Sequence, residues 1–236
     1  MTQIVSLSFF RFDTPVSKLW AFAMMGVARG AMARVPDIGF WKLCGSGTGE
    51  GFTPIPNTGV YAILATWPDE TTARDRTQNA DIYRKYHARA DESWTLYLST
   101  ETARGRWSGK APFSPTRDHA TGPLAALTRA TLKPGVAMKF WQRVPDISGV
   151  IGNDPAVMFK IGIGEVPWLQ QVTFSIWPDQ AAMDNFARKD GPHARAIAAV
   201  REGKWFKEEL YARFRVTGSE GTWGGRSPLD ATEVAA

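Results

Sequence analysis

Three histidines and one cysteine are the side chains of this 236-residue chain best suited to bind a metal. Cys44 and the histidines lack the spacing of a zinc site. His87 lies in a strongly polar stretch, which predicts a solvent-facing helix residue, and His119 lies in a loop rich in Ser, Pro and Thr. Only His193 has neighbours from which a binding site could be built.

His193 follows the sequence Asp190-Gly191-Pro192 and begins a helical pattern with alanine at every second position. Proline suits the first turn of a helix, and small residues would let a flat, bulky group lie close to it. Phe186, Trp205 and Phe206 supply apolar bulk nearby. An imidazole that faces an aromatic cavity can serve as an axial iron ligand. The alternative is an ordinary hydrogen-bonded histidine at a helix start, which a lone histidine favours.

Other motifs of catalysis are missing or incomplete. The glycine-rich run from Gly45 to Gly51 lacks the Gly-Lys-Ser/Thr ending of a phosphate loop, so a flexible connection between strands is the better interpretation. No Gly-x-Ser-x-Gly motif occurs, and the acidic residues are dispersed. Cys44 is expected to be a small apolar residue in or beside a strand. The pattern therefore disfavours serine hydrolases and paired-carboxylate chemistry.

Composition limits the partners and the compartment. The net charge is +5 and the pI about 9.4, but the basic residues are scattered, which disfavours nucleic-acid binding. A single cysteine cannot form an intrachain disulfide, so a cytoplasmic protein is expected. Ten tryptophans indicate an aromatic-lined cavity or contact with an apolar partner.

A helix is expected from Pro15 to Arg34, with an apolar stretch from Leu19 to Val27. No apolar run reaches the roughly 18 residues needed to span a bilayer. We favour a core helix that covers its sheet. The alternative is an interfacial helix that would place the protein peripherally at the inner membrane, within reach of a membrane-dissolved substrate.

The chain contains an internal repeat. Three motifs recur in the same order about 110 residues further on, which predicts two copies of one module. They are Val-Pro-Asp-Ile at 35–38 and 144–147, Trp-Pro-Asp at 67–69 and 177–179, and Gly-x-Trp-x-Gly at 105–109 and 221–225. Two copies are too few for a solenoid, so they resemble a fused dimer.

Each copy has an α+β element order. Strands are expected at 4–12, 39–44, 60–67 and 93–99, and in the second copy at 125–131, 157–163, 168–177 and 210–216. Helical segments are expected at 15–34, 70–91, 136–144 and 180–209, the last with a break at 190–192. This ferredoxin-like order predicts two tandem modules that form a pseudo-dimeric α+β barrel in one chain. Module one is assigned to residues 1–112, a linker to 113–123, module two to 124–225 and a flexible tail to 226–236.

Long stretches of the chain resemble the spheroidene monooxygenase family, over about residues 4–225. The resemblance rests on six segments: Val5–Phe12, Gly39–Pro54, Ala62–Asp69, Thr102–Gly109, Asp190–Ile197 and Trp205–Phe214. It implies an acyclic carotenoid 2-ketolase that oxidises C-2 of spheroidene through a hydroxyl to the ketone spheroidenone. Molecular oxygen and electrons from a reduced ferredoxin would be required.

The resemblance extends to haem-binding dimeric α+β barrels, in which a helix of the C-terminal half supplies the axial histidine. It therefore implies haem b as cofactor, His193 as its iron ligand, and module two as the haem-binding module. Phe186 and Trp205 would line the haem. Lys42 and Lys160 occupy similar strand positions in the two copies and are expected at the surface. The alternative is that they are partners of the haem propionates, and Lys160 is the one assigned to the haem site.

Two other functions remain open at this point. One is a different haem enzyme on the same barrel, such as an aldoxime dehydratase-like lyase, and the other is a non-catalytic module that holds haem or a hydrophobic ligand. A fold cannot choose among them. By the Trp-Pro-Asp repeat, Tyr83 stands where the second copy has His193, so one haem per chain is expected. The sequence leaves the oligomeric state open.

Overall fold

The computed structural model describes residues 2–116, 121–141, 156–188 and 205–229. Eight strands form a closed barrel in the order β1-β3-β2-β6-β7-β5-β8-β4, and every neighbouring pair is antiparallel. The strands are β1 (Ile4–Arg11), β2 (Trp41–Gly47), β3 (Pro56–Trp67), β4 (Glu92–Gly105), β5 (Leu124–Leu132), β6 (Phe159–Gly164), β7 (Gln170–Trp177) and β8 (Phe206–Gly221). The helical segments are α1 (Pro15–Met32), α2 (Glu70–Asn79), α3 (Asp81–His87), η1 (Pro134–Val136), α4 (Ala137–Trp141) and α6 (Gln180–Arg188).

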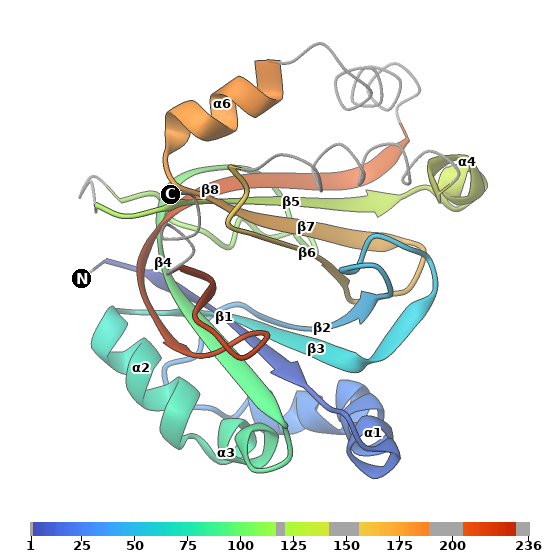
Figure 1. Ribbon diagram of the computed structural model, residues 1–236, viewed down its shortest axis with the longest axis vertical. Coiled ribbons are helices and arrows are strands. Elements are labelled where there is room, and N and C mark those ends of the chain that lie inside the picture. Colours follow the sequence, from blue (N-terminus) through green and yellow to red (C-terminus); the bar gives the residue numbers. More distant parts are fainter. Residues whose placement is uncertain (1, 117–120, 142–155, 189–204, 230–236) are drawn as a thin grey trace.

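Two four-stranded sheets make up this barrel. The strand orders of the two sheets, β4-β1-β3-β2 and β8-β5-β7-β6, are equivalent, because each runs through the fourth, first, third and second strand of its module. The sheets join along β4–β8 and β2–β6. Figure 1 shows the two sheets stacked, with α1, α2 and α3 outside the first and α6 outside the second. The predicted pseudo-dimeric α+β barrel is confirmed.

The Trp-Pro-Asp repeat ends a strand and starts a helix in both modules. Asp69 accepts a hydrogen bond from the backbone N–H of Thr72 at 2.8 Å, and Asp179 accepts one from the N–H of Ala182 at 2.8 Å. A carboxylate at the N-cap satisfies a backbone donor that the first helical turn leaves free. The same three residues therefore place α2 and α6 equivalently.

Helix α1 covers the first sheet as expected. Thr14 caps it by accepting a hydrogen bond from the N–H of Ser17 at 3.1 Å, and Pro15 opens it. Its buried residues recur at helical spacing against the sheet, namely Ala21, Met24, Ala28 and Met32. The interpretation as a core helix is confirmed for this side of α1.

Two expected helices differ from the structure. The helix expected at 70–91 is interrupted because Ala80 is extended, with φ −64° and ψ 138°. The helix expected at 180–209 was wrong at its end, because β8 already begins at Phe206. From there the buried residues alternate, with Leu210 and Ala212 facing the barrel interior, so the period is that of a strand. Residues 189–204 lie outside the described part of the chain.

The Gly-x-Trp-x-Gly repeat forms the same hairpin twice, and each hairpin docks on the other module. β4 pairs with β8 from Trp94, opposite Gly221, to Gly105, opposite Leu210. Gly105 and Gly221 have φ values of 104° and 86°, and a Cβ on either would lie 2.2 Å from a carbonyl oxygen of the facing strand. Only glycine fits such an approach. The two modules thus exchange their C-terminal segments reciprocally.

A carboxylate holds each hairpin in place. Glu208 accepts hydrogen bonds from the N–H groups of Ser108 and Gly109 at 2.9 and 2.7 Å. Glu92 does the same for Gly224 and Gly225, at 2.9 and 2.7 Å. An arginine completes each cluster, Arg129 at Glu208 and Arg11 at Glu92. The pseudo-twofold symmetry therefore extends to hydrogen bonds that join the modules.

These bonds predict a loss of stability in acid. Burial would raise the pKa of Glu92 and Glu208, but the backbone donors and the arginines outweigh it and hold both pKa values below the usual range. A folded-state pKa below the unfolded value, about 4.3, gives stability that is present above that value and lost as the pH falls through the folded pKa. We expect the free energy of unfolding to fall more steeply below about pH 4.3 in the wild type than in Glu92→Gln/Glu208→Gln. Urea unfolding between pH 7 and pH 3 measures this, and equal slopes would contradict it.

Candidate functional site

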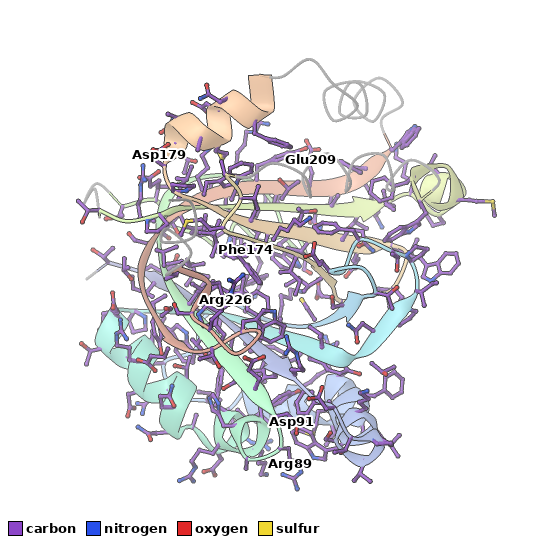
Figure 2. The ribbon with its side chains drawn as sticks, viewed as in Figure 1. Arg89, Asp91, Phe174, Asp179, Glu209 and Arg226 are labelled. Carbon is purple, nitrogen blue, oxygen red and sulfur yellow. The ribbon has the colours of Figure 1, made fainter. Side chains whose placement is uncertain are left out.

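The site that the sequence indicates belongs to the outer side of the second sheet, here called the module-two face. Leu127 on β5, Phe174 on β7 and Leu210 on β8 belong to the core inside the barrel. Because side chains alternate along a strand, the residues next to each of them point outward. Figure 2 shows Phe174 between the two sheets and Glu209 on the other side of β8. The central part of the module-two face consists of Ala126, Thr128 and Ala130 on β5, Thr173 and Ser175 on β7, and Lys160 and Gly162 on β6.

Small and polar residues replace bulky ones on this face. The pair Leu127–Phe174 corresponds to Leu7–Leu64 in the pseudosymmetric first sheet, which fixes the equivalent positions. Ala130, Gly162, Thr173 and Gln171 then stand where module one has Phe10, Leu43, Ile63 and Tyr61. The bulky module-one residues pack under α1, α2 and α3. These module-two residues are therefore smaller or more polar than their equivalents. Gly162 is covered by the β2–β3 connection and Ala130 is buried, whereas Thr128 is exposed.

Exposure differs between the two faces in the same way. Ser8 and Phe10 of module one are fully buried, at 0% relative exposure. Thr128, the equivalent of Ser8, is exposed, and Ala126 is half-buried. Thr128 lies at the middle of β5, so the most open part of the module-two face is its centre.

Phe186 lies at one end of this face. Its ring packs against Trp177 with centroids 5.1 Å apart, in a cluster with Leu124 and Met183. Trp177 donates its indole N–H to the hydroxyl of Ser175 at 3.0 Å. Ser175 in turn faces Lys160 across the β6–β7 pair. The structure thus connects two of the predicted site residues, Phe186 and Lys160, through two intermediates.

Trp205 lies at the opposite end of β5. It is buried, and its carbonyl accepts a hydrogen bond from the N–H of Lys133 at 3.0 Å, next to the paired residues Leu132 and Phe206. Eight strand positions separate Leu132 from Leu124, about 27 Å. Phe186 and Trp205 are therefore not in contact and instead border the two ends of the module-two face.

The two lysines do not occupy equivalent positions. Lys42 is opposite Leu64 and corresponds to Ile161, whereas Lys160 corresponds to Trp41. Neither is a surface lysine, since their side chains are only 13% and 15% exposed. Lys160 forms an ion pair with Glu50 at 2.9 Å. The expectation of two similar surface lysines was wrong, because strand alternation points one inward and the other outward.

His193, the predicted iron ligand, lies outside the described residues, in the segment between the end of α6 and Trp205. His119 lies outside them as well. His87 is half-buried rather than solvent-facing: Nδ1 is 3.2 Å from the hydroxyl of Ser93, and Nε2 is 3.0 Å from the carbonyl of Thr77. Both of its ring nitrogens are engaged in module one, so His87 is unsuited to bind a metal.

A second polar cluster lies at the barrel interior and was missed by the sequence analysis. Glu165 accepts from Lys42 Nζ at 2.6 Å and from the indole N–H of Trp107 at 2.6 Å. Cys44 is buried nearby, where burial and the Glu165 carboxylate raise the pKa of its thiol. Lys42 and Glu165 are 123 residues apart and belong to different modules, so no local pattern reveals the pair.

This cluster links the two sheets at the β2–β6 junction, where the strands share only the pairs Gly45–Gly164 and Ser46–Ile163. Glu165→Ala would leave the Lys42 ammonium and the Trp107 indole without their buried partner. We expect it to lower the free energy of unfolding by about 3–5 kcal/mol. Lys42→Met/Glu165→Leu removes both charges and should recover most of that loss, as measured by urea unfolding. A single variant as stable as the wild type would contradict this.

The β2–β3 connection contacts the second module closely. The N–H of Gly162 donates to the carbonyl of Glu50 at 2.8 Å, and a Cβ on Gly51 would lie 1.8 Å from the carbonyl oxygen of Gly162. The glycine-rich run therefore connects two strands, as predicted, and a glycine is required where it meets β6.

Within the described part of the chain, none of the helices combines the length and apolar character needed to cross a lipid bilayer.

Comparison with solved structures gives the fold alone. An aldoxime dehydratase aligns over 91% of this chain and 82% of its own, with a TM-score of 0.60 and 9% sequence identity. A second aldoxime dehydratase, in complex with butyraldoxime, aligns with a TM-score of 0.59 over 91% of this chain and 80% of its own. Both support the pseudo-dimeric barrel and, at this identity, say nothing about chemistry.

Comparison with known sequences gives the family. No family model matches the chain. Proteins named spheroidene monooxygenase from Cereibacter sphaeroides and Rhodobacter capsulatus are each 51% identical over 96% of this chain, covering 71% and 95% of their own lengths. A third, from Rubrivivax gelatinosus, is 31% identical over 90% of this chain and 82% of its own. The predicted family and monooxygenase class are confirmed: the chain belongs to the spheroidene monooxygenase family.

Proposed function

We propose that this protein is a haem-dependent monooxygenase that oxidises C-2 of an acyclic carotenoid, spheroidene, to the ketone spheroidenone through a 2-hydroxy intermediate. The observation that carries the substrate and reaction class is the 51% identity to two proteins named spheroidene monooxygenase. The haem, molecular oxygen and reduced ferredoxin are further parts of the proposal.

The described residues fit a haem. Its flat macrocycle needs a surface without bulky side chains, and the module-two face has the small, exposed Thr128 at its centre, with Trp177 and Phe186 at one end and Trp205 at the other. Module one fills the equivalent surface with Phe10 and other large residues. Between the two sheet faces of the described residues, this contrast favours the module-two face and supports the expectation of one haem per chain.

Each residue has a proposed role toward the haem. His193 would hold the iron, and Phe186 and Trp205 would border the face that receives the macrocycle. Lys160, a half-buried cation on the same face, would be the partner for a propionate carboxylate, in exchange for its ion pair with Glu50. Lys42 points toward the barrel interior and has no such role.

The haem, when bound, supplies the activation of molecular oxygen. The protein would hold the carotenoid with C-2 at the haem and exclude water from it. Retention of the 2-hydroxy intermediate allows a second oxidation at the same carbon, and the resulting geminal diol loses water to give the ketone. The basic chain, with a pI of about 9.4, suits an acidic electron donor such as a ferredoxin.

The test is turnover by the purified protein, expressed with haem supply. We expect a Soret band, and with spheroidene, a reduced ferredoxin system and O₂ we expect the 2-hydroxy compound followed by the ketone. Omission of O₂ should abolish both products. A haem-bound protein that gives neither product would overturn the proposal in favour of a binding module. Dehydration of an aldoxime without O₂ would favour the lyase.

A further inference from the structure

The exposed large hydrophobic side chains of the described residues come from a few segments of the chain. Among the described residues, eight such side chains are more than 40% exposed, and they come from four segments: α1, the β2–β3 connection, the β6–β7 connection and α4. They are Val16 (80%), Leu19 (70%), Phe22 (65%), Val27 (74%), Ile55 (64%), Met138 (71%), Val166 (41%) and Trp168 (51%). Single exposed hydrophobic residues are ordinary, but their concentration in a few segments marks an interaction surface.

The four segments are neighbours in space. A groove of about 210 Å³ is lined by Phe22 of α1, Pro54 of the β2–β3 connection, Trp141 of α4 and Trp168 of the β6–β7 connection. The indole N–H of Trp141 donates to the carbonyl of Trp168 at 3.0 Å. Figure 1 shows α1, α4 and these connections on the same side of the barrel, at the right of the view. We call this the apolar surface.

Helix α1 is apolar on two opposite sides. Ala21, Met24 and Ala28 are buried against the sheet, while Leu19 and Phe22 point away from it and are exposed. A helix of a water-soluble domain ordinarily exposes polar or charged residues on that outer side. The outer side of α1 therefore suits an apolar environment that the protein itself does not provide.

Basic residues outnumber acidic ones in these segments. Residues 15–32, 48–55, 133–141 and 165–169 contain Lys18, Arg29, Lys133 and Lys139, and two carboxylates, Glu50 and Glu165. Each carboxylate forms an ion pair within the protein, Glu50 with Lys160 and Glu165 with Lys42. An apolar helix face flanked by basic residues is the pattern of a helix that lies in the headgroup region of a bilayer. Basic residues there are attracted to anionic lipids.

We propose that the apolar surface docks the protein on an anionic lipid bilayer, with α1 lying flat in the interface. Its 18 residues span about 27 Å, too short and too well packed on the sheet to insert across the membrane. The role of this surface toward the substrate rests on the proposed function: a carotenoid dissolved in the bilayer would reach the protein here. Lipid docking itself needs neither haem nor substrate.

The test is co-sedimentation of the full-length protein with vesicles of phosphatidylglycerol or of phosphatidylcholine. We expect binding to phosphatidylglycerol vesicles to be at least about tenfold stronger, and to weaken with added salt without disappearing. Leu19→Glu/Phe22→Glu places two carboxylates on the apolar surface and should weaken that binding at least about tenfold. Both side chains are exposed, so the variant should fold normally.

A matched control carries the same two added charges elsewhere. Thr71→Glu/Ala181→Glu adds carboxylates at exposed positions of α2 and α6, away from the apolar surface, and should bind vesicles like the wild type. Equal vesicle binding by Leu19→Glu/Phe22→Glu and the wild type would overturn the proposal. So would no binding to either vesicle, or lipid-free self-association that the same double variant abolishes, since the occupant would then be a second copy.

Activity measurements separate this inference from the proposed function. The double variant should oxidise detergent-solubilised spheroidene as fast as the wild type, but should be slower with spheroidene in phosphatidylglycerol vesicles. If detergent turnover succeeds and vesicles are not bound, only the docking inference fails. If vesicles are bound and no turnover occurs in detergent, only the proposed function fails.

Discussion

Replacement of His193 by alanine is expected to remove the Soret band of the haem and, with it, all formation of the 2-hydroxy and ketone products. His87, the histidine that the structure describes, has both ring nitrogens engaged by Ser93 and Thr77. His193 is the proposed iron ligand because of the resemblance to haem-binding barrels, and an alanine cannot replace a coordinating nitrogen. Absorption spectra and haem content of the purified variant, expressed with haem supply, measure the effect.

His87→Ala is the matched control. It loses two hydrogen bonds in module one, so it should show a modest loss of stability with an unchanged Soret band and haem content. Full haem retention in His193→Ala would remove His193 from the ligand role. Loss of haem from His87→Ala at wild-type stability would place the iron in module one, against the proposal.

The second large effect is expected from Thr128→Phe, which fills the centre of the module-two face. Thr128 is exposed at the middle of β5, where module one has the fully buried Ser8. A phenyl ring there would occupy the space proposed for the macrocycle. We expect haem affinity to fall by at least about 100-fold, since the ring and the macrocycle cannot occupy one site. Titration of the haem-free protein with haemin measures it.

The fold should tolerate this change, because surface substitutions away from packed features shift the free energy of unfolding by about 0.5 kcal/mol or less. Thr71→Phe makes the same change at an exposed position of α2 and should bind haem like the wild type. Wild-type haem affinity in Thr128→Phe would show that the haem lies elsewhere.

The repeat motifs predicted the architecture because each has a physical task in both copies. Asp69 and Asp179 cap equivalent helices, and the glycines at 105 and 221 allow the same close strand approach. Motifs that meet the same local requirement twice imply the same fold twice. The barrel and its two modules could therefore be predicted from short segments alone.

The direction of individual side chains could not be predicted in this way. Lys42 and Lys160 look equivalent by counting along the repeat, but a shift of one strand position turns one inward and the other outward. The partners of such residues come from the other module, as Glu165 does for Lys42, 123 residues away. The sequence contains these residues, but only strand register brings them together.

Helix α1 shows how two interpretations of one pattern can both be useful. The sequence favoured a core helix and left an interfacial helix as the alternative. The structure buries Met24 and Met32 against the sheet, which confirms the first, and exposes Leu19 and Phe22 on the other side. Hydrophobic residues on both sides of the helix fit a packed inner side and the outer side proposed to face lipid.

Similarly, the predicted haem residues could be placed only in part. The sequence grouped Phe186, Trp205 and His193 because they are near one another along the chain. The structure separates Phe186 and Trp205 to opposite ends of β5, while the small residues between them, such as Thr128 and Ala130, belong to strands far away in sequence. The small size of these residues is recognised only when the outer face of the second sheet is compared, position by position, with that of the first.

The most direct test of monooxygenation is turnover of spheroidene under ¹⁸O₂ in ordinary water, with mass spectrometry of the 2-hydroxy intermediate. Its hydroxyl oxygen does not exchange with water, so the origin of the oxygen atom is preserved. The proposed reaction predicts one ¹⁸O atom in each 2-hydroxy molecule. Unlabelled hydroxyl oxygen would show that water is the source, and would contradict a monooxygenase mechanism.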